Sequence, residues 1–343
     1  MPLAAVHSPE EWATRFGSKS RAALSIGNFD GVHLGHQKIL RGVVERARRA
    51  NILAAAITFS PHPVSVLRPT LAPAQIETLE QRLARIEGLG LDAILVLHFD
   101  LAMAALAPEQ FVRQILVDSL HASAVLVGEN FRFGHRQSGD AQLLAALGRD
   151  LGFEVECIPP VIIRGTVVSS TAVRGAIAAG EVEKAARFLG RPVSLAGEIC
   201  SGTGTGRRFV FPTLNLATKQ ELLPARGVYA TETLLDGRAF RSATNVGVRP
   251  TFDGTHLTIE SHLFNFSEEI TSGPMEVCFW HRLRGEEKFS GADALRAQIQ
   301  LDLARARSFF ARLDSARVLM LKSGSQHPRR TGEPSTATGE KSK

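Results

Sequence analysis

Cysteine is scarce in this 343-residue sequence, which contains Cys157, Cys200 and Cys278 only. Three cysteines that lie so far apart do not suit a disulfide framework or a thiolate zinc site, so we expect a reducing compartment. The first ten residues show no basic segment followed by an apolar stretch, and no later apolar run is long enough to span a bilayer. We therefore expect a cytoplasmic protein with no membrane partner.

A strong excess of one charge is also missing. The sequence has 40 Lys and Arg against 34 Asp and Glu, a formal net charge of +6. This moderate charge suits any anionic partner, and part of it falls on a helical-looking stretch with Arg46, Arg48 and Arg49, where a solvated face is expected. We expect no nucleic-acid partner, and a monomer or weak homo-oligomer.

The first half of the chain alternates short apolar runs with segments of helical period. The runs that read as strands are 22–26, 53–59, 93–97 and 124–127. This alternation is typical of βαβ units and predicts a parallel sheet flanked by helices. The length of the chain leaves room for a second core after it.

The pattern changes after a helical stretch over 170–189, which ends at Gly190 and is followed by Pro192. Beyond it, short β-rich segments separated by Gly, Pro and Asp turns predict a small β-barrel or sandwich. An amphipathic pattern over 294–313 predicts a final helix that could cover one mouth of the barrel, and the polar end predicts a disordered tail. We divide the chain into a first domain over 1–184, a linker over 185–194, a second domain over 195–316 and a tail over 317–343.

A glycine-rich turn joins the first of these strands to a predicted helix. Residues 27–37 read GNFDGVHLGHQ, at a junction where open α/β sheets bind ligands. Glycines let backbone N–H groups approach a phosphate, and His33 and His36 at the helix N-terminus can reach the same anion. The turn therefore predicts a phosphate site. The alternative is a tight turn whose histidines only cap the helix or bind a metal.

This turn resembles the HxGH nucleotidyltransferase superfamily, and the full string is similar to the FMN adenylyltransferase half of bacterial FAD synthetases. TFSPHP at 58–63, VGENFRFG at 127–134 and SSTAVR at 169–174 resemble further motifs of that family, in its order. The resemblance implies a Rossmann-like domain. In it, an FMN phosphate oxygen would attack the α-phosphorus of ATP, giving FAD and pyrophosphate.

The resemblance also implies roles for single residues. His33 and His36 would stabilise the α-phosphate during the attack. Phe59, His62, Asn130 and Phe133 would line the flavin side. Without the neighbouring motifs, 169–171 could equally cap a helix and the phenylalanines could be core residues. The residues implied to bind ATP and its phosphates are Gly27, Asn28, Phe29, Asp30, Gly35, Ser169, Ser170, Thr171 and Arg174.

A second candidate site lies at the start of the β-rich half. Residues 202–207 read GTGTGR, a loop rich in donors that could bind phosphate, and 211–215 read FPTLN. The Thr213 hydroxyl and the Asn215 amide project from the same side of an extended chain and offer the hard oxygen ligands that Mg²⁺ prefers. The alternative is a polar pair on a solvated strand.

This segment resembles the riboflavin kinase domain, whose hallmark GRxxGFPTxN appears here as GRRFVFPTLN, with Val210 in place of glycine. The similarity continues through LLPARGVYA at 222–230, NVGVRPTF at 245–252, IESHLFNF at 259–266 and RLRGEEKF at 282–289. It implies that Thr213 and Asn215 hold Mg²⁺. The residues implied to contact ATP in this domain are Gly202, Gly206, Arg207 and Pro212.

Glu260 lies inside an apolar strand, where an unpaired carboxylate is costly to bury. It is therefore either outward-facing or functional, and the resemblance implies a general base for the riboflavin hydroxyl that attacks ATP. Asn265 stands where the family has Asp, and 268–277 lacks the family's Tyr-Gly.

We predict a bifunctional enzyme with Mg²⁺ as cofactor and riboflavin, FMN, FAD, ATP and pyrophosphate as its substrates and products. The alternatives are a single-function FMN adenylyltransferase with a kinase-like flavin-binding domain, and a binding protein without turnover.

Overall fold

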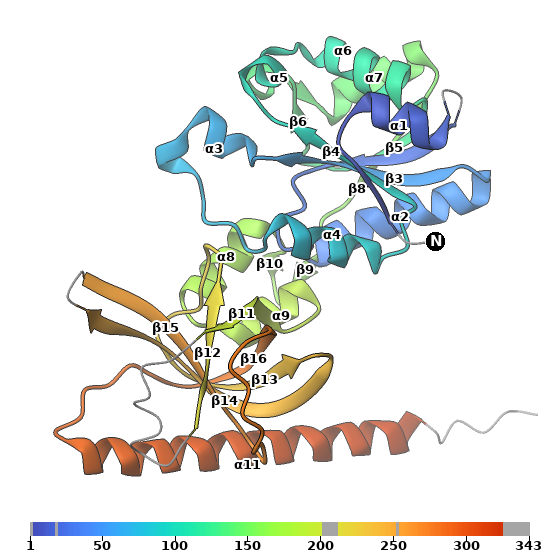
Figure 1. The fold of residues 1–343 in the computed structure, drawn as a ribbon. Helices are drawn as coiled ribbons and strands as arrows, with labels where there is room; N and C mark the ends of the chain where they lie inside the picture. The colour runs from blue at the N-terminus through green and yellow to red at the C-terminus, as the bar shows by residue number, and fades with distance from the viewer. Residues whose placement is uncertain (1–2, 18–19, 201–211, 252–253, 325–343) are drawn as a thin grey trace, which may run out of the picture.

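The computed structural model describes residues 3–17, 20–200, 212–251 and 254–324. Within them, an α/β domain stands on a β-barrel domain, with two green helices between them and one long orange helix against the barrel (Figure 1). The α/β domain followed by a small barrel confirms the predicted fold class.

The α/β domain is built on a six-stranded sheet in the order β1-β4-β3-β2-β5-β8, in which every pair is parallel. The chain builds outward from β2 through β3 to β4 and then crosses to β5, so the order reverses between β2 and β5. In open α/β sheets such a reversal creates a crevice at the carboxyl ends of the strands. The strands are β1 (Ala4–Val6), β2 (Ala22–Ile26), β3 (Leu53–Ser60), β4 (Ala93–His98), β5 (Ala122–Gly128) and β8 (Glu154–Ile158).

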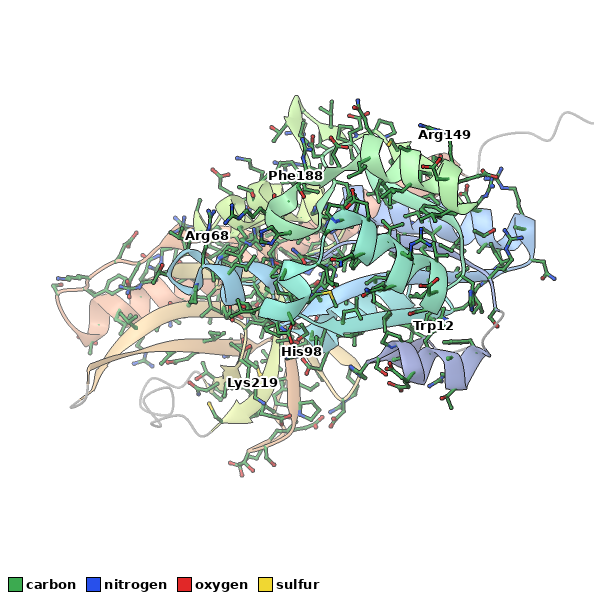
Figure 2. The ribbon with its side chains drawn as sticks, turned by 90° about the horizontal axis from the view of Figure 1, so that it is seen from above. Trp12, Arg68, His98, Arg149, Phe188 and Lys219 are labelled. Carbon is green, nitrogen blue, oxygen red and sulfur yellow. The ribbon has the colours of Figure 1, made fainter. Side chains whose placement is uncertain are left out.

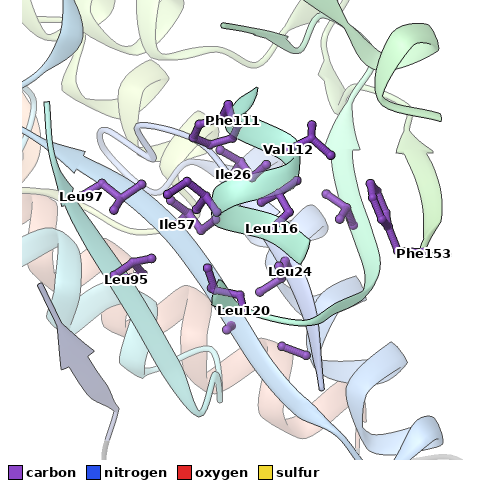
Figure 3. Packing of buried hydrophobic residues seen from close by; sticks show 14 of the residues in the cluster. Leu24, Ile26, Ile57, Leu95, Leu97, Phe111, Val112, Leu116, Leu120 and Phe153 are labelled. Carbon is purple, nitrogen blue, oxygen red and sulfur yellow. The ribbon is translucent and has the colours of Figure 1, made fainter. Parts of the chain in front are cut away.

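Both faces of this sheet are covered, which is why its strands read as apolar runs rather than as alternating patterns. On one face, Phe111, Leu116 and Leu120 pack against Leu24 and the strands beside it (Figure 3). On the same face, Trp12 of α1 is fully buried (Figure 2). The opposite face is covered by α2 and α4.

The helices of this domain are α1 (Pro9–Phe16), α2 (Leu34–Ala50), α3 (Pro63–Leu67), α4 (Leu79–Glu87), α5 (Leu101–Ala105), α6 (Pro108–Phe111) and α7 (Ala141–Leu151), with the 3-10 turns η1 (Pro69–Leu71) and η3 (His135–Gln137). The π-helical segment η2 (Val112–Ser119) continues α6. Two small hairpins pair β6 (Arg132–Phe133) with β7 (Gly139–Asp140) and β9 (Ile162–Ile163) with β10 (Thr166–Val167).

The second domain is a closed antiparallel barrel in the order β11-β12-β15-β14-β13-β16. Its interior combines apolar side chains with hydroxyls that satisfy one another: Thr231 lies 2.8 Å from Ser242 and 2.6 Å from Thr244 (oxygen to oxygen). The strands are β11 (Val193–Cys200), β12 (Leu214–Thr218), β13 (Gly227–Leu235), β14 (Arg238–Thr251), β15 (Gly254–Leu263) and β16 (Pro274–Gly285).

One end of the barrel is covered by α8 (Ser170–Ala178) and α9 (Val182–Leu189). Their apolar faces share one core with barrel residues such as Leu195, Tyr229 and Phe279. The segment 185–194, predicted as a linker, is therefore the second half of α9 followed by the start of β11. The reason is that Phe188 and Leu189 are buried in the barrel core.

The final helix α11 (Ala292–Gly324) lies outside the barrel wall rather than over a mouth. Leu303, Ala306 and Phe310 pack against outward-facing Ala230 and Ala243. The helix also continues into the predicted tail, as far as Gly324, because 316–322 is made largely of good helix formers.

Candidate active sites

The two histidines of the glycine-rich turn stand together where α2 begins. His33 is the N-cap of α2, and its Nδ1 accepts the backbone N–H of His36 at 3.3 Å. The two rings stack with their centroids 3.6 Å apart. Capping and ligand binding are compatible here, because a neutral His33 whose Nδ1 accepts carries its proton on Nε2.

Burial governs the charge of both rings. It lowers the pKa of His33 to about 4, although the carboxylate of Asp30 acts in the opposite direction. Burial also lowers the pKa of His36 well below its usual value, and the neighbouring His33 adds to this shift. Both imidazoles are therefore neutral near pH 7. Among the described residues, the buried Nδ1 of His36 has no hydrogen-bond partner.

Asp30 holds the turn in place. Its carboxylate is 1% exposed and accepts the backbone N–H of Ile76 at 3.0 Å and of Glu77 at 3.3 Å. Nη2 of Arg174 donates to it at 2.8 Å. Two residues predicted to contact ATP therefore contact each other, and a buried carboxylate is suited to orient the turn rather than to bind phosphate directly.

The N-terminus of α8 meets that of α2. Ser169 caps α8 by accepting the backbone N–H of Ala172 at 3.2 Å, and Ser170 donates to the carbonyl of Asp30 at 3.0 Å. Thr171 is exposed in the first turn of α8. Two helix N-termini thus face one region, where their dipoles favour an anion.

A cavity of about 1230 Å³ opens beside the turn. Its wall includes five residues that the sequence assigned to the site: Gly27, Asn28, Phe59, Asn130 and Phe133. The sequence reasoning missed Phe99, Met103, Phe131 and the cationic Arg68 and Arg132, which also line it. They lie on short helices, loops and the two-residue strand β6, which have no periodic pattern to mark them.

His62 does not line this large cavity. It lines a second one of about 230 Å³, between the two domains, and Phe59 lines both. The Nε2 of His62 lies 3.2 Å from the Asn28 amide. Phe29 is buried and packs edge-on against His36 at 5.3 Å between ring centroids, so it supports the histidines.

In the barrel, the strand register brings polar residues side by side. Asn215 on β12 lies opposite Glu260 on β15, and Glu260 lies opposite Asn245 on β14. Residues directly opposite in antiparallel strands point to the same face. Glu260 faces outward, because its neighbours Ile259 and Ser261 face the interior. Asn245 belongs to the motif NVGVRPTF, but only the strand register reveals that it lies beside Glu260.

Pro212 and Thr213 lie just before β12. The Nδ1 of His262, on the strand beside them, is 2.9 Å from the carbonyl of Pro212. Burial lowers the pKa of His262, so a neutral ring donates this bond and holds the segment. Gly202, Gly206 and Arg207 lie outside the described residues.

Two positions differ from the riboflavin kinase motifs, and the structure describes only one of them. Asn265 adopts a left-handed conformation with φ of 56°, which Asn and Asp both tolerate, so the change from Asp suits the turn. Val210 lies outside the described residues. In the described part of the chain, no group of three or more His, Cys, Asp or Glu could hold a metal ion.

Two family models match successive parts of the chain. Residues 16–172 match FAD synthetase, and residues 189–310 match riboflavin kinase. The bifunctional riboflavin kinase/FMN adenylyltransferase of Haemophilus influenzae is 36% identical over 289 residues, covering 84% of this chain and 94% of that protein. The chain belongs to this bifunctional family. The protein of the same description from Pseudomonas fluorescens is 38% identical over 290 residues, covering 84% of this chain and 92% of the relative.

The riboflavin kinase/FMN adenylyltransferase family accounts for both halves of the chain. The presence of both domains supports two activities over the single-function alternative. A solved structure from Streptococcus pneumoniae, described as a macrolide-efflux protein, shares the architecture with a TM-score of 0.79 and 26% identity, covering 90% of this chain and 99% of that one. In the described residues, no helix is both long and apolar enough to cross a membrane.

Proposed function

We propose that the residues gathered at the two sites carry out the two family reactions in sequence. Riboflavin becomes FMN on the barrel, and FMN becomes FAD in the α/β domain. The observation that carries the proposal is the meeting of the α2 and α8 N-termini around His33 and His36, beside the large cavity. Helix N-termini are suited to bind phosphates.

For adenylyl transfer, an FMN phosphate oxygen forms a bond to the α-phosphorus of ATP as the bond to the bridging oxygen of pyrophosphate breaks. His33 donates from Nε2–H to the α-phosphate, and His36 supports it from the stacked position. Nearby negative charge favours the protonated form of an imidazole, so a bound phosphate would raise the pKa of His33 and strengthen its hydrogen bond to the α-phosphate. Positioning and charge stabilisation carry this step.

The large cavity supports flavin binding beside this centre. Phe59 and Phe99 pack edge to face at 5.8 Å between centroids, and Phe131 and Phe133 stack at 5.4 Å. Aromatic walls of this kind suit a planar ring system. His62 would act through Asn28, which lines the cavity.

For the kinase step, Glu260 takes the proton of the terminal ribityl hydroxyl, whose oxygen attacks the γ-phosphorus of ATP while ADP leaves. The residues at this site fit Mg²⁺. The Thr213 hydroxyl, the Asn215 amide oxygen and the Glu260 carboxylate, which lies directly opposite Asn215, are hard oxygen ligands. Thr213 and Asn215 would hold the ion with ATP phosphate oxygens. When bound, Mg²⁺ would neutralise charge on the transferred phosphoryl group.

The cysteine-poor sequence supports a cytoplasmic location. The enzyme acts there on small molecules, as a monomer or weak homo-oligomer.

Product analysis over time tests the proposed function. The protein is incubated with riboflavin, ATP and Mg²⁺, and in parallel with supplied FMN. We expect FMN to appear before FAD in the first reaction. FAD from supplied FMN without any FMN from riboflavin would restore the single-function alternative, and ATP retention without release of ADP or pyrophosphate would restore the binding protein.

A further inference from the structure

The turn that carries His33 is strained. Gly31 has φ of +79°, and the next residue, Val32, has φ of +37° although it is β-branched. A β-branched residue is a genuine outlier in this region, and such conformations persist only where their surroundings hold them. The turn also has little room, because a Cβ on Gly31 would lie 2.9 Å from Ile76.

Arg191 holds this turn from the far side of the domain boundary. It lies between α9 and β11, at the entry to the barrel. Its Nη2 donates to the carbonyl of Gly31 at 2.8 Å, and its Nη1 lies 3.4 Å from the carbonyl of Val32. Gln37 supports the same point by donating to the carbonyl of Val32 at 2.9 Å.

These contacts bear on the phosphate site through one peptide plane. The Val32 carbonyl and the His33 N–H belong to the same planar unit and point in opposite directions. A carbonyl held toward Arg191 and Gln37 therefore fixes the direction of the His33 N–H at the start of α2. The same contacts fix the backbone that carries the His33 ring.

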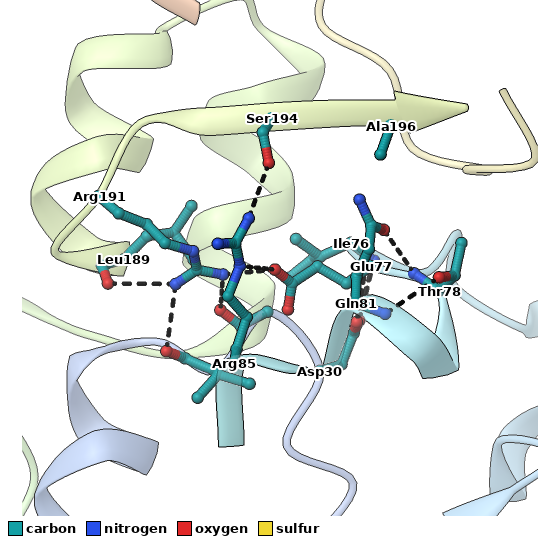
Figure 4. Close-up of polar contacts among 12 residues, drawn as sticks. Asp30, Ile76, Glu77, Thr78, Gln81, Arg85, Leu189, Arg191, Ser194 and Ala196 are labelled. Carbon is teal, nitrogen blue, oxygen red and sulfur yellow. Dashed lines mark hydrogen bonds and ion pairs between the residues drawn. The ribbon is translucent and has the colours of Figure 1, made fainter. Parts of the chain in front are cut away.

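Glu77 closes the arrangement into a ring (Figure 4). Its carboxylate accepts from Nη2 of Arg191 at 2.5 Å, while its backbone N–H donates to Asp30. The turn is thus tied to Glu77 twice, once through Asp30 and once through Arg191. The Arg191 side chain is only 20% exposed and that of Glu77 6%, so water screens this pair weakly.

We propose that Arg191 is a positioning residue for adenylyl transfer. Its fork holds Gly31, Val32 and Glu77 together, so the entry segment of the barrel domain completes the phosphate-binding turn of the other domain. Arg191 acts through the turn and needs no contact with ATP or FMN. This inference rests on the proposed role of His33 and His36.

The test measures kcat and KM for FMN adenylylation in the full-length Arg191→Met variant. We expect kcat to fall roughly 10- to 100-fold, as small misplacements of reacting groups do, while KM for FMN and ATP changes little. Riboflavin phosphorylation in the same protein stays at the wild-type rate. Millimolar guanidinium ion is expected to restore part of the lost kcat.

Arg85→Met is the matched control. Arg85 also crosses the interface, donating to Ser194 at 3.1 Å and Glu276 at 3.0 Å and lying 3.5 Å from Glu77, and no hydrogen bond joins it to the described turn residues 29–32. We expect it to keep its adenylylation kcat. An equal loss in both variants, or a parallel loss of kinase activity in a folded Arg191→Met protein, would show general loosening and overturn the proposal.

Arg191→Lys serves if the Met variant does not fold. Lys keeps the charge but lacks the planar fork that reaches two carbonyls and a carboxylate, so a reduced kcat is expected and a full kcat would overturn the proposal. Wild-type protein that makes no FAD from FMN and ATP would instead remove the proposed function. If wild type and Arg191→Met adenylylate FMN equally well, the positioning role of Arg191 is rejected and the proposed function stands.

Discussion

At the scale of single residues, His33 has an observed structural role beside its proposed chemical one. It caps α2 through Nδ1, which leaves Nε2–H directed away from the helix. The sequence gives phosphate binding as the prediction and capping as its alternative, and the structure shows that His33 caps the helix. The sequence does not predict the depressed pKa, which comes from burial under segments distant in the chain.

The depressed pKa of His33 makes stability depend on pH. The unfolded chain binds a proton on this residue near its ordinary value of 6.5, whereas the folded protein resists protonation until about pH 4. The contribution of neutral His33 to the free energy of unfolding is therefore fully present above about pH 6.5 and is lost as the pH falls toward 4. Urea unfolding at pH 7 and at pH 5 gives the free energy of unfolding at each pH. Its decrease between the two should be about 2 kcal/mol smaller in His33→Gln than in wild type. Equal losses in the two proteins would contradict this, and exposed His7→Gln is the control.

Glu260 is a second residue whose proposed role can be isolated. Glu260→Gln keeps the size and the hydrogen-bonding capacity of the side chain but removes the base. We expect riboflavin phosphorylation to fall by roughly 10²-fold or more, while FMN adenylylation is unchanged, as measured by separate assays on the same preparation. Glu268→Gln, an exposed carboxylate paired with Arg238 in the same domain, should leave both rates unchanged. A full kinase rate in Glu260→Gln would remove this residue as the base.

At the scale of elements, the hydrophobic pattern predicts the strands and helices whose buried faces produce that pattern. The apolar runs at 22–26 and 93–97 are strands because both faces of the sheet are covered, and the 3.6-residue period of α2 follows its packing on one face. The large cavity could not be predicted in the same way. Phe99 and Met103 reach it from a short loop and a five-residue helix, whose positions depend on tertiary packing.

Helix α11 shows how far amphipathic spacing alone determines an element. Leu303, Ala306 and Phe310 occupy one face, as the pattern predicts, and bury it against the barrel wall. These residues meet the barrel where its outward-facing side chains are small, as at Ala230. The alternating pattern of a strand shows which residues face outward, but it does not show which element packs against them.

Phe310 is the strongest test of that packing. Phe310 is 4% exposed and belongs to the same buried cluster as Phe264, and the guanidinium carbon of Arg241 lies 4.3 Å from its ring centroid. We expect Phe310→Ala to destabilise the barrel domain by about 3–5 kcal/mol, seen as a lower Tm for loss of kinase activity. Leu301→Ala, on the same helix but 44% exposed, should change it little. Similar Tm values for the two variants would show that α11 does not stabilise the barrel.

At the scale of the whole molecule, the two domains share a polar interface that joins residues far apart in the chain. Arg85 reaches Glu276, and Arg191 reaches Gly31. The sequence predicts the two fold types in their order, but it contains no local pattern for contacts across more than a hundred residues. For this reason a linker was predicted where α9 and the start of β11 connect both domains.

Gln220 joins the two domains through four side-chain hydrogen bonds. Its Nε2 donates to the carbonyls of Ile76 at 3.2 Å and Ser194 at 3.1 Å, and its Oε1 accepts from Gln81 at 3.0 Å and from the Ala196 N–H at 2.8 Å. The side chain is 6% exposed, so its loss leaves buried polar groups unpaired.

We expect Gln220→Ala to weaken the domain interface by about 2 kcal/mol or more. Each domain keeps its own core, so the effect is a loss of coupling as well as of stability. Heating wild type should inactivate both reactions in one transition, whereas the variant should lose them at separate temperatures. Gln114→Ala, at an exposed position of η2, controls for the substitution itself. A single transition at the wild-type temperature in Gln220→Ala would mean that the apolar contacts of α8 and α9 with the barrel join the domains without this residue.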